Sequence, residues 1–186
     1  MSQKMRQIII FFIGTALGVG LDQWTKYLAF SRLKGQDAIV LWKDVFELQY
    51  LENRGAAFGM LQGKQGFFFV IAAVVLAAAV YFLWKMPCSK KYLPLFISLC
   101  LITAGAIGNM IDRVRLEFVI DFLYFKLINF PIFNVADCYV TVATAAVMIL
   151  ILFYYQENDL EVFGLGGIKK ANDEQKDKTM GGEETD

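Results

Sequence analysis

The stretch Gly105–Cys138, GAIGNMIDRVRLEFVIDFLYFKLINFPIFNVADC, decides the fold because it joins two long apolar segments through a polar connection. It carries three aspartates, Asp112, Asp121 and Asp137. An ionisable side chain at or inside a membrane boundary costs roughly 3 kcal/mol unless it is paired or hydrated. Three carboxylates between two candidate membrane spans therefore indicate a functional site.

The composition favours a small integral membrane domain, since 57% of the 186 residues are hydrophobic and only 19% are charged. Eighteen basic and 18 acidic residues give no net charge, which argues against a nucleic-acid partner. The chain has no histidine, so histidine-based triads and imidazole zinc sites are excluded. The three cysteines lack CxxC spacing, and Cys100 and Cys138 are interpreted as small apolar residues. Acid–base chemistry would thus fall to carboxylates.

Four apolar segments approach the roughly 20 residues that a membrane-spanning helix needs. They are Ile8–Leu21, Gly66–Trp84, Leu93–Ile111 and Val135–Tyr155. The first follows Lys4 and Arg6 and could be a signal peptide, but no A-x-A-like cleavage site follows it. A retained helix is therefore the preferred interpretation.

The segment between the first two spans predicts a small sheet or hairpin outside the lipid. Phe46, Leu48 and Tyr50 alternate with polar residues, after the apolar run Ile39–Trp42. The expected fold class is therefore a membrane all-α protein, with four transmembrane helices and a small extracytoplasmic β-sheet between helices 1 and 2. Residues 1–156 are expected to form one domain, and the charged residues 157–186 a disordered cytoplasmic tail.

The direction of the spans predicts that the polar residues meet at one interface. Because four spans alternate in direction, the ends of spans one and three lie on the same side as the starts of spans two and four. Residues at these ends, or in the connection on that side, are Asp22, Asn53, Asn109, Asp112, Arg113, Asp121, Asn134 and Asp137. The loop 84–93 on the other side is basic and contains no acid, so we expect that loop and both termini to be cytoplasmic. The site would then face outward.

Two carboxylates in one partly desolvated site can share a proton, because both cannot easily ionise. The ionised member then takes a proton from water while the neutral member donates to a carbonyl oxygen, as in aspartic proteases. Asp121 has no neighbouring cation and is hard to explain as a structural residue. Asp137 could instead be a first-turn carboxylate favoured by the helix dipole.

The other aspartates also have structural interpretations. Asp112 lies beside Arg113 and is interpreted as an ion-paired support at the interface. Asp22 and Lys26 are one turn apart, so Asp22 either caps the helix end or supports the site.

Two functions from other classes remain open at this point. One is a small proton-linked transporter or channel, in which Asp22, Asp121 and Asp137 line an ion path. The other is a non-catalytic membrane assembly factor whose outer hairpin binds a partner. The transporter is disfavoured because the costly residues gather at one interface and none marks a relay at the midplane.

Five sequence blocks add a more specific indication. They are DQWTK at 22–26, NRGAAF at 53–58, GAIGNMIDR at 105–113, VIDF at 119–122 and FNVAD at 133–137. In these blocks and in their order, the chain resembles the lipoprotein signal peptidases, the signal peptidase II family of bacterial aspartyl peptidases. Two positions depart from the family pattern, since Glu117 stands where glycine is common and Cys138 where serine or another small residue is more frequent.

The resemblance implies a catalytic pair at Asp121 and Asp137. The implied reaction cleaves diacylglyceryl-prolipoproteins just before the lipid-modified cysteine, in the bacterial cytoplasmic (inner) membrane and near its outer leaflet. Membrane lipid would be the other partner, and no metal or organic cofactor is required. Carried over by position, the substrate-binding or supporting residues are Asp22, Asn53, Gly55, Asn109, Arg113 and Asn134.

Overall fold

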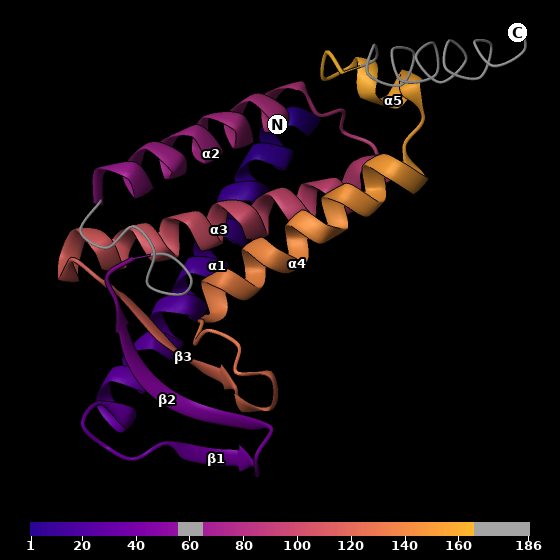
Figure 1. Cartoon of the computed structure of the whole chain (residues 1–186). Coiled ribbons are helices and arrows are strands. Elements are labelled where there is room, and N and C mark those ends of the chain that lie inside the picture. The colour runs from indigo at the N-terminus through magenta and orange to yellow at the C-terminus, as the bar shows by residue number, and fades with distance from the viewer. Residues whose placement is uncertain (56–64, 166–186) are drawn as a thin grey trace, which may run out of the picture.

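The computed structural model describes residues 1–55 and 65–165. In this part of the chain, four long helices carry a small antiparallel sheet at one end (Figure 1). The helices are α1 (Gln3–Leu33), α2 (Gln65–Lys85), α3 (Leu93–Leu116) and α4 (Val135–Ile149), which continues as the π-helical turn Leu150–Tyr154. All four are long and apolar enough to cross a membrane. The predicted fold class is thereby confirmed.

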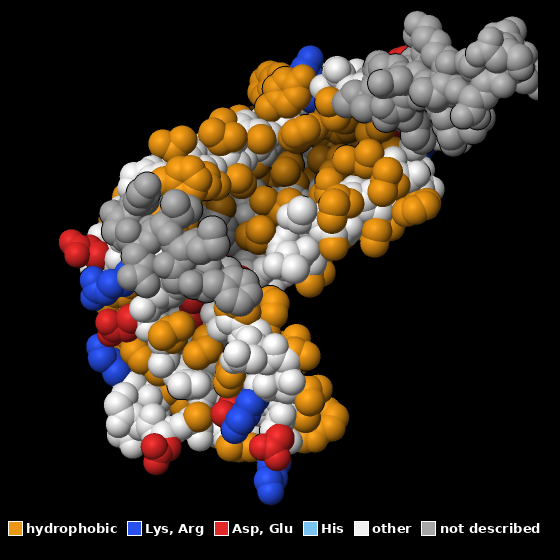
Figure 2. All heavy atoms as spheres, viewed as in Figure 1, with side chains coloured by type: hydrophobic (Ala, Val, Ile, Leu, Met, Phe, Trp, Pro, Cys, Tyr) orange, Lys and Arg blue, Asp and Glu red, His pale blue; other side chains and the backbone are white. Residues whose placement is uncertain are grey.

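Hydrophobic side chains cover much of the helical part, where Val70, Val74 and Val80 of α2 are each more than half exposed. Figure 2 shows this apolar surface over the helices, whereas charged side chains gather mainly around the sheet end. An apolar helical surface of this extent is typical of contact with lipid hydrocarbon. The chain is therefore a multi-pass membrane protein.

The sheet has three strands in the order β1 (Ile39–Trp42), β2 (Phe46–Asn53) and β3 (Val119–Phe125). The predicted hairpin is confirmed as β1 and β2. The third strand comes from the connection between α3 and α4, so Asp121 lies on a strand rather than in a loop. Leu51 pairs with Asp121, and Asn53 therefore lies diagonally opposite Asp121 on the same face of the sheet.

The first span is longer than predicted. The span Ile8–Leu21 was expected to have Asp22 at its far end, but the helix α1 continues to Leu33. Asp22 and Lys26 form an ion pair of 3.0 Å one turn apart on a buried side of the helix, so these charges satisfy each other without ending it.

Two glycines of α3 allow the helices to meet at the sheet end. A Cβ atom on Gly105 would lie 2.6 Å from the carbonyl oxygen of Ala136 in α4, and one on Gly108 would collide with the carboxylate of Asp22 in α1. Glycine is thus the residue that lets α3 approach both neighbours where the polar side chains gather.

Glu117 shows how the chain turns from α3 into β3. It ends α3 in the left-handed conformation with φ of 66°, where glycine is the preferred residue. A side chain in this conformation costs roughly 1 kcal/mol, which the fold tolerates here. The turn therefore keeps the geometry that glycine would give.

The packed part of the chain extends beyond the predicted boundary at residue 156. Glu157–Glu161 form the short helix α5 at the end opposite the sheet (Figure 1), although residues 157–186 were expected to be a disordered tail. Leu160 and Phe163 are buried, and Lys91 pairs with Asp159 at 2.6 Å. Burial of these two apolar side chains orders residues 157–165 despite the charged composition of the segment. The rest of the predicted tail, 166–186, lies outside the described residues.

Replacing Phe163 with alanine is expected to lower the free energy of unfolding by about 3 kcal/mol, because its buried ring packs against Phe82 and Tyr92. Thermal unfolding in detergent would measure the change. Val162→Ala is the matched control, since Val162 is 39% exposed. Equal melting temperatures for the two variants would show that the packing of Phe163, just after α5, does not contribute to stability.

Candidate functional site

Asp121 and Asp137 come from different elements and meet around amide side chains. The Asp121 carboxylate is 1% exposed and accepts hydrogen bonds from Nδ2 of Asn53 at 2.8 Å and Nδ2 of Asn134 at 2.6 Å. Asp137 Oδ1 accepts a hydrogen bond from Nδ2 of Asn109 at 2.8 Å. Residues from β2, β3, α3 and α4 therefore build one polar site.

Asn134 connects the two aspartates. As the N-cap of α4, its Oδ1 accepts a hydrogen bond from the Asp137 backbone N–H at 3.0 Å, while Asp137 Oδ2 accepts one from the Asn134 backbone N–H at 3.2 Å. Asparagine is among the preferred N-cap residues, and this reciprocal pair is a capping box. Because the Asn134 amide also donates to Asp121, one fully buried residue holds both carboxylates in place.

The surroundings of Asp121 favour its protonated form. Burial raises the pKa of Asp121 to about 7, and the nearby charge of Asp137 acts in the same direction. The hydrogen bonds from Asn53 and Asn134, and the charge of Lys26, partly oppose this rise in the pKa. Asp121 can therefore exchange a proton near neutral pH.

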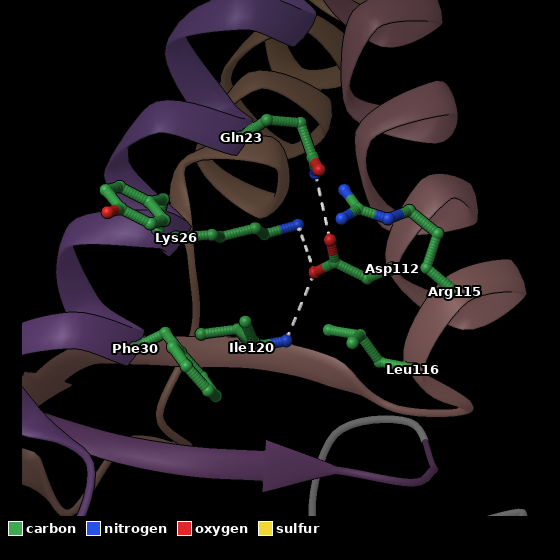
Figure 3. A pocket seen from close by; sticks show the side chains of 8 residues that line it. Gln23, Lys26, Phe30, Asp112, Arg115, Leu116 and Ile120 are labelled. Atoms are coloured by element: carbon green, nitrogen blue, oxygen red, sulfur yellow. Dashed lines mark hydrogen bonds and ion pairs between the residues drawn. The ribbon is translucent and has the colours of Figure 1, made fainter.

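A second polar cluster lies between α1 and α3, and Figure 3 shows Gln23 and Lys26 reaching Asp112 there. Its centre is the buried ammonium of Lys26, which contacts Asp22 Oδ2 and Asp112 Oδ2 at 3.0 Å each and donates to Asn109 Oδ1 at 2.8 Å. Gln23 donates to Asp112 Oδ1 at 2.9 Å. This cluster thus borders the candidate site through Asn109.

The predicted ion pair between Asp112 and Arg113 is wrong, since Asp112 pairs with Lys26. Successive residues of a helix point about 100° apart, so the two neighbours face different surroundings. Arg113 donates to the backbone oxygens of Asn109 and Gly55 at 3.2 and 3.4 Å. Its guanidinium also lies 4.3 Å from the ring centre of Phe68.

A cavity of about 690 Å³ opens beside the aspartates. Both aspartates line it, together with four of the predicted supporting residues, Asn53, Gly55, Asn109 and Arg113. Asn134 is buried beneath them, and Asp22 belongs to the Lys26 cluster. The remaining wall is mostly apolar and includes Phe125, Phe130, Ile132, Phe133 and Val142. A mostly apolar cavity with a few polar groups at one wall is the usual form of a ligand or substrate site.

From the sequence, Lys26 was expected only to pair with Asp22, and no role was predicted for Gln23. A lysine within an apolar helix is itself a signal, because its charge must find a partner.

Residues 56–58 of the NRGAAF block lie outside the described part of the chain. Within the described part, no group of three or more acidic or cysteine side chains could hold a metal ion.

Four apolar helices, a buried aspartate with a second, half-buried aspartate beside it, and an adjoining apolar cavity are typical of a multi-pass membrane enzyme with acid–base chemistry. The family model described as signal peptidase (SPase) II matches residues 14–153, and the chain belongs to this family of peptidases. The matched region contains the whole candidate site and ends before α5.

Individual relatives agree with this assignment. A lipoprotein signal peptidase of Streptococcus thermophilus is 43% identical over 155 residues, which cover 83% of this chain and 97% of the relative. One from Caldanaerobacter subterraneus is 45% identical over 150 residues, covering 80% and 97%. Among solved structures, a bacterial membrane enzyme determined by the in meso method has a TM-score of 0.68 and 33% identity, covering 80% of this chain and 96% of that one.

Proposed function

We propose that Asp121 and Asp137 are the catalytic pair with which this chain removes signal peptides from diacylglyceryl-prolipoproteins, by cleavage just before the lipid-modified cysteine. The observation that carries the proposal is the convergence of both carboxylates on Asn134 at the wall of an apolar cavity. Family membership favours a peptidase over the transporter and the assembly factor.

The carboxylates supply both acid and base. Asp121 carries the shared proton, in keeping with its raised pKa of about 7, and donates it to the oxygen of the scissile carbonyl. Asp137 takes a proton from a water molecule, whose oxygen bonds to the carbonyl carbon. When the C–N bond breaks, Asp137 gives its proton to the leaving amine, and a hydroxyl of the tetrahedral intermediate returns a proton to Asp121. Water is thus consumed, and one carboxyl group and one amine are formed.

The apolar wall of the cavity explains why the substrate would have to carry a lipid. Acyl chains of the substrate would lie along Phe130, Ile132 and Val142, which places the bond to be cleaved beside the carboxylates. Binding energy from the lipid thereby positions a bond that offers little side-chain recognition of its own. The cavity lies at the sheet end, which we assign to the outer leaflet, with both termini in the cytoplasm.

Cleavage of a purified prolipoprotein, followed by mass spectrometry, tests this function. The substrate should be cut just before its cysteine when that residue carries diacylglycerol, and should remain intact when it does not. Addition of a chelator should leave the rate unchanged. Equal cleavage of both substrate forms would contradict the lipid requirement, and loss of activity with the chelator would contradict a metal-free reaction.

Cleavage is expected to decline as the pH rises through about 7, because Asp121 then loses the shared proton. The charged groups that act on Asp121 are Asp137 of α4, Lys26 of α1 and Arg113 of α3. Asn53→Ala removes a hydrogen bond that lowers the pKa of Asp121, so the decline should move to higher pH. Initial rates measured across this pH range would reveal both effects. A decline that moved to lower pH in Asn53→Ala would contradict the assignment.

A further inference from the structure

Lys26 occupies a central place in the buried cluster behind the candidate site. Its ammonium has three hydrogens and no acceptor, and the structure offers it three oxygens, from Asp22, Asp112 and Asn109. Figure 3 shows the side chain reaching from α1 toward Asp112 on α3. All three donors are thus used, one within α1 and two across to Asn109 and Asp112 of α3.

Each carboxylate of this cluster holds the backbone next to a catalytic aspartate. Asp22 Oδ1 accepts a hydrogen bond from the backbone N–H of Ala136 at 2.9 Å, one residue before Asp137. Asp112 Oδ2 accepts one from the backbone N–H of Ile120 at 3.2 Å, one residue before Asp121. Through these contacts, Lys26 links the start of α4 to the start of β3.

The third contact fixes the orientation of an amide. Asn109 Oδ1 accepts hydrogen bonds from Lys26 Nζ at 2.8 Å and from Asn134 Nδ2 at 3.1 Å. Because an ammonium can only donate, the amide oxygen must face Lys26, and Nδ2 then points to Asp137 Oδ1 at 2.8 Å. A reversed amide would present its oxygen to the carboxylate of Asp137.

The pocket of about 230 Å³ beside this cluster is lined by apolar side chains as well as polar ones, namely Tyr27, Phe30, Leu116 and Ile120. Apolar side chains alone could therefore also pack α1 against α3. A buried cation with two carboxylates gives little net stability over such packing. The polar cluster therefore has its main consequence in geometry, which is what a pair of reacting carboxylates requires.

We propose that Lys26 is a positioning residue for the peptidase reaction, which sets the separation of Asp121 and Asp137 through Asp22 and Asp112 and the orientation of Asn109. The proposal rests on the catalytic role of these two aspartates. Lys26 acts through its three neighbours without touching the substrate.

Three variants test the proposal with a diacylated prolipoprotein as substrate. Lys26→Met removes the ammonium and leaves two carboxylates. Lys26→Met with Asp112→Asn removes the cation and one of the two carboxylates, so the net charge of the cluster is that of the wild type. Lys4→Met is the control, because Lys4 is also on α1 and bonds to Leu83 O and Met86 O at the opposite end.

Both Lys26 variants are expected to lose about 100-fold in kcat with little change in KM, because the cavity that binds the substrate is retained. In Lys26→Met the alkaline decline in activity should move to higher pH, since the charge of Lys26 lowers the pKa of Asp121. In the double variant the decline should return toward the wild-type pH while kcat stays low. Lys4→Met should keep the wild-type kcat and pH profile.

The outcomes separate the proposal from its alternatives. Wild-type kcat in the double variant would overturn the proposal, because charge balance alone would then explain the role of Lys26. A loss of kcat in Lys26→Met without a shift of the pH profile would also overturn it. If Lys26→Met does not fold, the kcat of the double variant decides. Failure of the wild-type chain to cleave, or activity in Asp121→Asn, would instead refute the proposed function.

Discussion

Replacing Asp121 or Asp137 with asparagine is expected to lower kcat by about 10²–10⁴-fold. Each substitution keeps the shape of the side chain but removes the group that carries or accepts the proton. Asp121 is buried and Asp137 lines the cavity, and both are held by side-chain amides. Rates of prolipoprotein cleavage at saturating substrate would measure the loss.

Asp44→Asn provides the matched control for both variants. Asp44 is exposed in the turn between β1 and β2, where its φ of 60° suits asparagine as well as aspartate. It should therefore retain the wild-type rate. Wild-type activity in Asp121→Asn or Asp137→Asn would remove that residue from the catalytic pair.

The second large effect is expected at Asn134, the residue that joins the pair. Asn134→Ala removes the amide that donates to Asp121 and to Asn109, and it also removes the cap of α4. The lost cap costs about 1 kcal/mol of stability, and the unsatisfied buried groups add about 1–3 kcal/mol. We expect kcat to fall by about 100-fold, because Asp121 and Asp137 are no longer held to one residue.

The Asn134→Ser variant separates the helix-capping role of Asn134 from its hydrogen bond to Asp121. A serine can accept the hydrogen bond from the Asp137 backbone N–H, so it should restore about 1 kcal/mol relative to alanine. It cannot reproduce the amide contact with Asp121, so kcat should remain low. Thermal unfolding and cleavage assays on the two variants would measure both quantities. A serine variant with wild-type kcat would show that capping is the whole role of Asn134.

Much of the site could be predicted from the sequence because span direction is a strong constraint. The alternation of four spans brought Asn53, Asn109, Asp121, Asn134 and Asp137 to one end, where the structure places them together. The motif blocks then distinguished Asp121 and Asp137 from the other aspartates. Their catalytic role remains a prediction.

The third strand could not be predicted because Val119–Phe125 is almost continuously apolar and lacks the alternation of β2. The partner of Asp112 was missed for a different reason. Adjacency in sequence suggested Arg113, whereas the contact with Lys26 joins two helices that are distant in sequence. The burial of Leu160 and Phe163 could not be predicted either, because the residues after Gln156 are mostly charged or polar and this burial depends on tertiary packing.

A single turnover in water enriched in a heavy oxygen isotope tests the central claim most directly, namely that Asp121 and Asp137 activate a water molecule. If they do, the label should appear in the new carboxyl group of the released signal peptide, with none in either aspartate. The control is a turnover in ordinary water followed by transfer to labelled water. Label in Asp121 or Asp137 after one turnover would reveal a covalent acyl intermediate and contradict the proposed reaction.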